Sequence, residues 1–295
     1  MLKGRVRDGR APLIYAVLDF PTAPPVASKS SASKSSTDRN SVANLRAGKS
    51  SGKPSGGGGG STLWENVKAI LVTLAIFLAI RTFLIEAYRI PSGSMIPTLL
   101  VGDWLFVNKL AYGPHVPFTN INLPGYDDPE RGDVVVFVSP NQVDQPNDPN
   151  PILVKRLVAV AGDTVWMRGG VFHVNGMAQR QGFAAAENPK GDGGFSHPLF
   201  SWQKPFEIRG TAAGDPPAQP TLDDWGPLVV PANFLFMLGD NRYDSKDGRY
   251  WGFVPRENVR GRPVFVYYSY VADESVRPLP FITDIRWGRI GTILK

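Results

Sequence analysis

The sequence predicts a mainly β fold, in which an antiparallel β-sheet domain carries a smaller inserted β subdomain and follows one N-terminal transmembrane helix. Beyond residue 86, apolar residues come in short β-branched or aromatic runs, and glycine, proline or aspartate bounds most of them. No stretch between these runs is long and periodic enough for a crossover helix, so we expect antiparallel pairing. The six predicted strands are Trp104–Val107, Val134–Val138, Thr164–Met167, Val171–Val174, Phe234–Leu238 and Val264–Tyr268.

The composition excludes several kinds of site. The 295 residues include no cysteine, so disulfides, thiol catalysis and cysteine-based metal centres are excluded. The three histidines, His115, His173 and His197, are widely spaced and form no i, i+4 pair. We therefore expect no metal site and no cofactor.

Residues 1–60 form a basic tail that we expect to be disordered. They hold ten Lys or Arg against three Asp, whereas the whole chain has a net charge of +6. From about residue 24 the tail is rich in Ser, Gly, Lys and Pro, and such a segment buries too little apolar surface to offset its conformational entropy. A basic tail can bind nucleic acid, but this one precedes an apolar segment, which favours a role in membrane orientation.

The segment 64–85, Trp64 to Ile85, is predicted to be a membrane anchor. Its charge-free centre, 69–80, has the length of a core helix or of a signal-peptide centre, but the full 22 residues span roughly 33 Å as a helix. Lys68 and Arg81 would then extend toward the two membrane surfaces. No small-residue cleavage site follows the centre, so we expect an uncleaved, single-pass anchor. The basic tail predicts a cytoplasmic N-terminus.

The β region divides, in this interpretation, into a main domain, 86–164 and 229–295, and an inserted subdomain, 165–228. Arg168-Gly169-Gly170 and Asn175-Gly176 are hairpin-turn signals near the start of the insertion. Residues 179–228 are polar and rich in Gly, Pro and Asp, which predicts an insertion or a poorly packed subdomain.

Ser94, which follows a glycine, and Lys155, which lies in an apolar run, are the candidate reactive pair. A serine hydroxyl needs a base, and no histidine stands beside candidate acids in a suitable context. On a strand, Lys155 would share a face with Leu153 and Leu157 and lose hydration, which lowers its pKa and favours the neutral amine that a base must be. The alternative is a lysine whose stem covers apolar surface while its ammonium group reaches water.

The nucleophile segment also holds candidates for an oxyanion hole. Ser92 and the backbone N–H of Ser94 could donate to a developing oxyanion, and Gly93 between them permits a tight turn. Taken alone, Ser-Gly-Ser is also common in ordinary loops.

The run Gly239–Gly252 is a third polar cluster. Asp247 and Arg249 are close enough in sequence to share an ion-pair network, and Ser245 could form a hydrogen bond with an amine. The alternative is an ordinary charged loop, but the bracketing aromatic residues and glycines favour an ordered one.

Several segments of the chain match one family in sequence and in order. They are Ile90–Leu99, Arg131–Phe137, Val154–Asp163 and Gly239–Gly252. In these segments the chain resembles bacterial type I signal peptidases. The resemblance extends from the anchor to at least Pro255 and weakly to 289–291.

The resemblance implies a membrane-anchored Ser/Lys endopeptidase that removes signal peptides from exported preproteins after small residues, in an Ala-X-Ala pattern. It implies an inner-membrane protein with its catalytic domain on the outer face. The partners would be preproteins and membrane lipid, without nucleic acid, and the protein would be a monomer.

The resemblance also implies roles for individual residues. Ser94 would be the nucleophile and Lys155 the general base, with Ser92 and the Ser94 N–H as the oxyanion hole. Ser245 would orient the lysine amine, while Asp247 and Arg249 would order the loop around it. Two shallow pockets for small side chains would be surrounded by Tyr88, Ile90, Met95, Leu99, Leu153 and Val154.

The chain departs from the family's pattern in the third cluster. Tyr243-Asp244-Ser245 stands where Asp-Asn-Ser is expected, and Gly248 stands where a serine is usual. Two alternative functions are also compatible with the sequence. One is a catalytically inactive membrane-anchored module that binds preproteins, and the other is a Ser/Lys autoprotease of the repressor type, against which the anchor and the third cluster argue.

Overall fold

A computed structural model describes residues 59–117, 119, 121–179, 196–211, 213–272 and 275–294, without the side chains of 59–62. The predicted tail, 1–60, lies almost wholly outside these residues. The chain divides into two compact units, Met1–Lys68 and Ala69–Lys295, and both β-sheets belong to the second.

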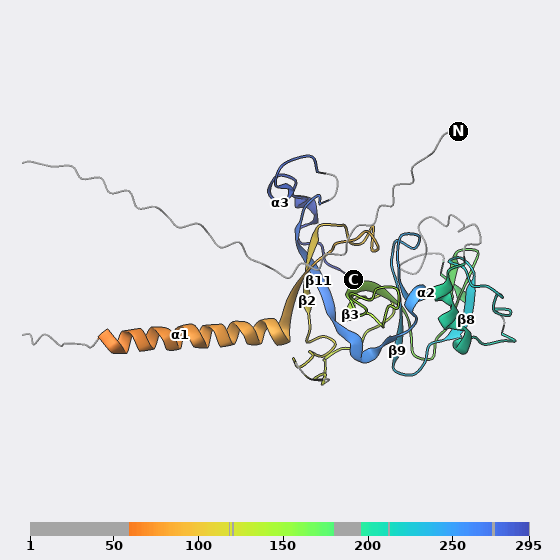
Figure 1. The fold of residues 1–295 in the computed structure, drawn as a ribbon, viewed down its shortest axis with the longest axis horizontal. Helices are drawn as coiled ribbons and strands as arrows, with labels where there is room; N and C mark the ends of the chain where they lie inside the picture. Colours follow the sequence, from red (N-terminus) through yellow and green to blue (C-terminus); the bar gives the residue numbers. More distant parts are fainter. Residues whose placement is uncertain are drawn as a thin grey trace, which may run out of the picture. The chain divides into compact units, whose positions relative to one another are not determined.

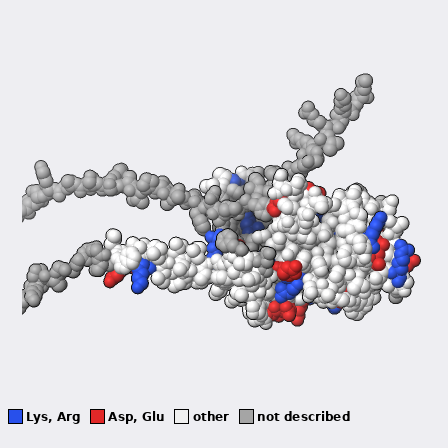
Figure 2. Space-filling model, turned by 60° about the horizontal axis from the view of Figure 1, so that its bottom comes forward, with Lys and Arg blue, Asp and Glu red and all other residues white. Residues whose placement is uncertain are grey.

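The predicted anchor is helical. Helix α1, Gly59–Ala79, continues into a π-helical turn, η1, Ile80–Leu84. Within it, Leu63–Leu84 has a mean hydropathy of 2.1 and is not buried in the structure. Figure 2 shows its exposed surface as largely uncharged. An apolar helix of 22 residues is long enough to cross a membrane.

The larger sheet has seven strands, all paired antiparallel (Figure 1). In spatial order they are β1 (Ile85–Arg89), β2 (Asp103–Asn108), β11 (Val259–Ser269), β3 (Val134–Val138), β4 (Ile152–Val160), β9 (Phe234–Leu238) and β10 (Val254–Pro255). The strand β11 has register shifts against both of its neighbours, β2 and β3. Such irregularities bend a strand and let it serve two parts of one sheet.

The smaller sheet has four strands and lies between β4 and β9 in the sequence. In spatial order they are β7 (Met177–Ala178), β6 (Val171–Val174), β5 (Thr164–Arg168) and β8 (Trp225–Val229). Both predicted hairpin turns are present, because Gly169 and Gly170 join β5 to β6 with positive φ, and Asn175 and Gly176 join β6 to β7 in the same way. Positive φ at both central positions is the requirement of the tight hairpin turn.

Short helices complete the described chain. They are η2 (Pro198–Phe206), α2 (Gly248–Trp251), η3 (Arg256–Asn258), α3 (Pro280–Thr283) and η4 (Trp287–Arg289). The nine residues of η2 pack against α2 and β8.

An apolar cluster joins the two sheets. Phe236 and Leu238 from β9 pack with Phe172, Trp225 and Leu228 from the smaller sheet. The Phe236 ring lies 5.5 Å from Trp225 between centroids, in a tilted pair. The smaller sheet is therefore packed onto the strand that leads directly into the Gly239–Gly252 run.

The predicted fold class is confirmed, and all six predicted strands are present. The expectation of a poorly packed segment within 179–228 is wrong for the residues that the structure describes. Phe200 in η2 and Trp225 and Leu228 in β8 are fully buried. Antiparallel sheets host many functions, so the fold by itself does not identify the activity.

Candidate active site

The strand β4 carries the candidate lysine at the centre of the larger sheet. Lys155 is opposite Val135 on β3, and Leu153 is opposite Phe137. Leu153 and Leu157 pack into one apolar cluster, whereas Val154 packs against another. The alternation of faces along β4 is therefore the one that the sequence predicts.

The candidate serine lies in the connection between β1 and β2. Ile96 N–H donates to the Gly93 carbonyl at 3.1 Å, and Leu99 N–H donates to the Met95 carbonyl at 2.9 Å, so two successive turns hold Ser94. Its hydroxyl oxygen accepts a hydrogen bond from the Lys155 amine. Two residues that are 61 positions apart in the sequence are thus in direct contact.

The environment of Lys155 favours its neutral form. The residue is only 3% exposed, so the alternative in which its ammonium group reaches water is wrong. Burial lowers the pKa of Lys155 to about 8, against the opposite effect of the Asp247 and Asp240 carboxylates. An amine with that pKa is neutral often enough near neutral pH to accept a proton.

The Asp247 and Arg249 side chains form a buried ion pair beside the lysine. Both are at most 1% exposed, and Arg249 Nε lies 2.8 Å from an Asp247 carboxylate oxygen. Asp247 also accepts from the backbone N–H groups of Gly239 and Arg249, at 3.0 and 3.2 Å. Although burial raises the pKa of Asp247, the Arg249 charge and hydrogen bonds hold it below its ordinary value. The Asp247–Arg249 pair therefore orders this loop, with its carboxylate satisfied by both side-chain and backbone donors.

Ser245 is buried beside Gly239, and in the part of the chain that the structure describes its hydroxyl has no hydrogen-bond partner. It makes no hydrogen bond with Lys155. A Cβ added to Gly239 would lie 2.1 Å from the Ser245 hydroxyl and 2.5 Å from the Ser94 carbonyl oxygen. Gly239 is therefore the point at which the loop and the nucleophile segment come into contact.

A second set of contacts, which the sequence did not indicate, joins the same segments. Asp240 accepts from Arg156 Nε at 2.8 Å and Nη2 at 2.7 Å, and it accepts from the Thr98 hydroxyl. Asn241 donates from its backbone N–H to the Ser94 carbonyl and from its side chain to the Gly93 carbonyl, both at 3.1 Å. The loop is thus hydrogen-bonded to the backbone carbonyls of Gly93 and Ser94.

The predicted pocket residues lie in two separate clusters. Ile90, Met95 and Leu99 are buried together, with Tyr88 and Val154 packed against them. Leu153 packs instead against the cluster on the other side of β4. Ser92, the oxyanion candidate, is exposed next to Gly93.

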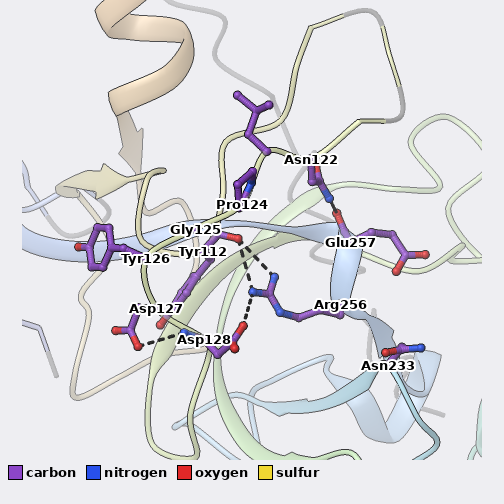
Figure 3. Close-up of a pocket in the computed structure, with 11 residues that line it drawn as sticks. Tyr112, Asn122, Pro124, Gly125, Tyr126, Asp127, Asp128, Asn233, Arg256 and Glu257 are labelled. Carbon is purple, nitrogen blue, oxygen red and sulfur yellow. Dashed lines mark hydrogen bonds and ion pairs between the residues drawn. The ribbon is translucent and has the colours of Figure 1, made fainter.

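A cavity of about 820 Å³ lies elsewhere and contains none of the predicted site residues. Figure 3 shows Arg256 within it, between the Asp128 carboxylate and the Tyr112 carbonyl. The three histidines have other roles, because His115 contacts Asn122, His173 stacks on Trp166, and His197 caps η2.

A family model described as signal peptidase, peptidase S26, matches residues 63–268. The chain belongs to this signal peptidase family. Signal peptidase I of Pseudomonas fluorescens is 36% identical over 244 aligned positions, and the match covers 78% of this chain and 79% of that protein. Signal peptidase I of Aquifex aeolicus strain VF5 is 30% identical over 260 aligned positions, and the match covers 76% of this chain and 93% of that protein.

Another relative, a signal peptidase I from Enterococcus faecalis V583, has a crystal structure. It is 27% identical and covers 46% of this chain and 97% of that chain, with a TM-score of 0.27, which is too low to compare the folds. The family identifies the chain as a signal peptidase, and it favours neither the inactive module nor the repressor-type autoprotease.

We predict that Gly239→Ala lowers the rate of cleavage by about a hundredfold, because the added methyl group displaces either Ser245 or the Ser94 backbone. The measurement is kcat on a preprotein, together with a thermal unfolding curve. Gly288→Ala is the matched control, because a Cβ there meets nothing within 4 Å. If the Gly239→Ala variant folds and keeps the kcat of the unsubstituted protein, the close contact of Gly239 with Ser245 and the Ser94 backbone is not needed for cleavage, and the prediction is wrong.

Proposed function

We propose that the protein cleaves signal peptides from exported preproteins after small residues, in an Ala-X-Ala pattern, with Ser94 as nucleophile and Lys155 as general base. The observation that carries the proposal is the hydrogen bond between the buried Lys155 amine and the Ser94 hydroxyl. A base must lie within hydrogen-bond reach of the proton that it takes, and its pKa must suit the working pH. Both conditions are met by this lysine.

The reaction proceeds in two steps. Neutral Lys155 takes the proton of the Ser94 hydroxyl as its oxygen attacks the scissile carbonyl, and the resulting ammonium gives a proton to the departing amine. The remaining acyl-enzyme is an ester of Ser94. Lys155 then takes a proton from a water molecule, which attacks the ester, and returns a proton to Ser94 as the signal peptide leaves.

The oxyanion that forms in each step needs fixed hydrogen-bond donors. We assign this role to the Ser94 backbone N–H and the Ser92 hydroxyl. The Asn241 contacts to the Gly93 and Ser94 carbonyls support the assignment, because they hold the backbone of this turn in one orientation. Ser92 is exposed, so its hydroxyl is free to rotate toward a bound substrate.

The supporting residues act on the lysine. Asp247 and Arg249 order the loop, and Ser245 orients the amine when Lys155 is neutral. The buried Ser245 hydroxyl supports this role, because a buried hydroxyl without a partner is costly and gains from any nearby acceptor. A neutral amine has a lone pair that can accept such a bond.

The small-residue preference follows from apolar pockets near the nucleophile. We assign their walls to Tyr88, Ile90, Met95, Leu99, Leu153 and Val154. Three of them, Ile90, Met95 and Leu99, are buried in one apolar cluster, and a long substrate side chain would have to displace this packed wall.

We also propose a single-pass membrane protein with its N-terminus in the cytoplasm and its catalytic domain on the outer face of the inner membrane. The length and hydropathy of Leu63–Leu84 support an anchor, and the basic tail supports the orientation. In this arrangement 86–164 and 229–295 form the catalytic domain of a monomer, with 165–228 inserted in it. Its partners are preproteins and membrane lipid.

We predict that Ser94→Ala and Lys155→Ala each abolish cleavage of an Ala-X-Ala preprotein, because each removes one half of the proton transfer. The measurement is the yield of mature product by gel mobility after incubation in detergent micelles. Ser201→Ala, an exposed serine in η2, is the matched control and is expected to cleave normally. Full activity in either dyad variant would eliminate the proposed mechanism.

The pH dependence of kcat provides a separate prediction. Because the folded-state pKa of Lys155 is lowered to about 8, the active neutral form is lost as the pH falls through that value. We expect kcat to rise from acid pH to a plateau above pH 8 and to be about a hundredfold below the plateau two pH units under the pKa. A profile that is flat between pH 6 and pH 9 would contradict a neutral lysine base.

The orientation can be tested by proteolysis of sealed membrane vesicles. Protease added to the outer face of right-side-out vesicles is expected to digest the domain after residue 86 and to spare the basic tail. Immunoblots for each terminus measure the outcome, with detergent-opened vesicles as the control. Protection of the domain and digestion of the tail would reverse the proposed orientation.

A further inference from the structure

Asp244 is an exposed acidic residue in the catalytic loop, at the position where the family's pattern leads us to expect asparagine. A backbone hydrogen bond to the Asn241 carbonyl, at 3.1 Å, holds it in a turn. It lies between Tyr243, whose hydroxyl donates to Asp223 at 2.9 Å, and buried Ser245. Because both neighbours are held in place, the backbone position of Asp244 is fixed although its side chain is exposed.

The Asp244 carboxylate lies beside the nucleophile segment. A carbon added to Gly93 would be 3.6 Å from one of its oxygens. Gly93 directly precedes Ser94, whose hydroxyl contacts Lys155. The carboxylate is therefore at the rim of the site, where a substrate backbone must approach the serine.

The other acidic groups of this loop are already paired. Asp240 binds Arg156, and Asp247 binds Arg249. Lys246, the nearest cation along the chain, binds Asp144 at 2.7 Å instead. Among the residues that the structure describes, Asp244 has no ion-pair partner within 4.0 Å. Its negative charge is thus available to a bound substrate.

We propose that Asp244 is a specificity-determining residue that favours substrates with a cationic side chain, and disfavours those with an anionic one, next to the scissile bond. The inference rests on the proposed Ser94 chemistry, because it assumes that substrate lies against Gly93. It adds a charge preference to a site whose remaining selectivity is for small apolar side chains.

The expected size of the effect follows from exposure. An ion pair between exposed side chains contributes little free energy in water. The corresponding change in kcat/KM is about two- to fivefold. The Debye length is about 8 to 10 Å at ordinary ionic strength, and it shortens as salt is added, which weakens the attraction between exposed charges. The preference is therefore expected to weaken at high salt, unlike a preference that depends on shape.

The experiment compares Ala-X-Ala peptides that differ at one position beside the scissile bond, which carries Lys, Gln or Glu. The positions tested are the residue that follows the scissile bond and, separately, X, because the two alanines must stay small; the full-length protein is used in non-ionic detergent micelles. At one position we expect kcat/KM to fall in the order Lys, Gln, Glu by about two- to fivefold per step. Asp244→Asn is expected to abolish this order, as is 1 M salt.

Asp128→Asn is the matched control. It removes the same charge from an exposed carboxylate in the separate cavity of Figure 3, and it is expected to leave the charge preference intact. An effect of net charge alone would appear equally in both variants and would overturn the proposal.

A second readout separates a charge effect from a local distortion. Lys155 has Asp247, Asp240, Asp244 and Arg249 around it, and the Asp244 charge raises its pKa. Asp244→Asn is therefore expected to shift the acid limb of kcat to lower pH. Equal cleavage of the Lys and Glu peptides by the unsubstituted protein, or a preference that persists in Asp244→Asn, would overturn the proposal. Failure to cleave even the Gln peptide would instead overturn the proposed function.

Discussion

The structure depends on the burial of one amine. Lys155 lies on the interior strand β4 and is only 3% exposed, and this burial is the largest influence on its pKa. In water an amine with an ordinary pKa is almost fully protonated at neutral pH and cannot act as a base. The interior position of β4 in the seven-stranded sheet therefore serves the proposed chemistry as well as the structure, because an edge strand would leave the amine hydrated.

The buried ion pair of Asp247 and Arg249 also influences the pKa of Lys155. Asp247 raises the pKa of Lys155 while Arg249 lowers it, so the pair orders the loop with partly cancelling electrostatic effects on the base. Burying such a pair is unfavourable unless its hydrogen bonds are satisfied, and here the carboxylate accepts from the Gly239 and Arg249 backbones as well. Removing one partner would leave an uncompensated buried charge.

Much of the fold could be predicted from local patterns, and the exceptions have physical reasons. Asn175-Gly176 marks a hairpin because its backbone conformation is a local property. The strand β1 was not predicted because Ile85–Arg89 continues the apolar anchor directly, and β8 was not predicted because it contains Gly226 and Pro227. Both strands are recognised by the strands with which they pair, β2 and β5, and this pairing cannot be read from a local sequence pattern.

The candidate pair, Ser94 and Lys155, could also be named from the sequence, whereas the contacts that hold these two segments together could not. Alternation placed Lys155 on an apolar face, but the Thr98–Asp240–Arg156 contacts join residues 58 to 142 positions apart. The glycine at 248, where a serine is usual, has a packing reason. A Cβ there would lie 2.8 Å from the Phe236 ring, which belongs to the cluster between the two sheets. The neighbouring core therefore leaves no space for a side chain at this position.

The pKa of Lys155 can be measured by NMR titration of its labelled side chain in the detergent-solubilised protein. The Lys155→Arg variant identifies the signal by its disappearance. We predict a titration midpoint near pH 8 for the Lys155 amine, as a buried base requires. A midpoint near that of a free lysine, about 10.4, would contradict it.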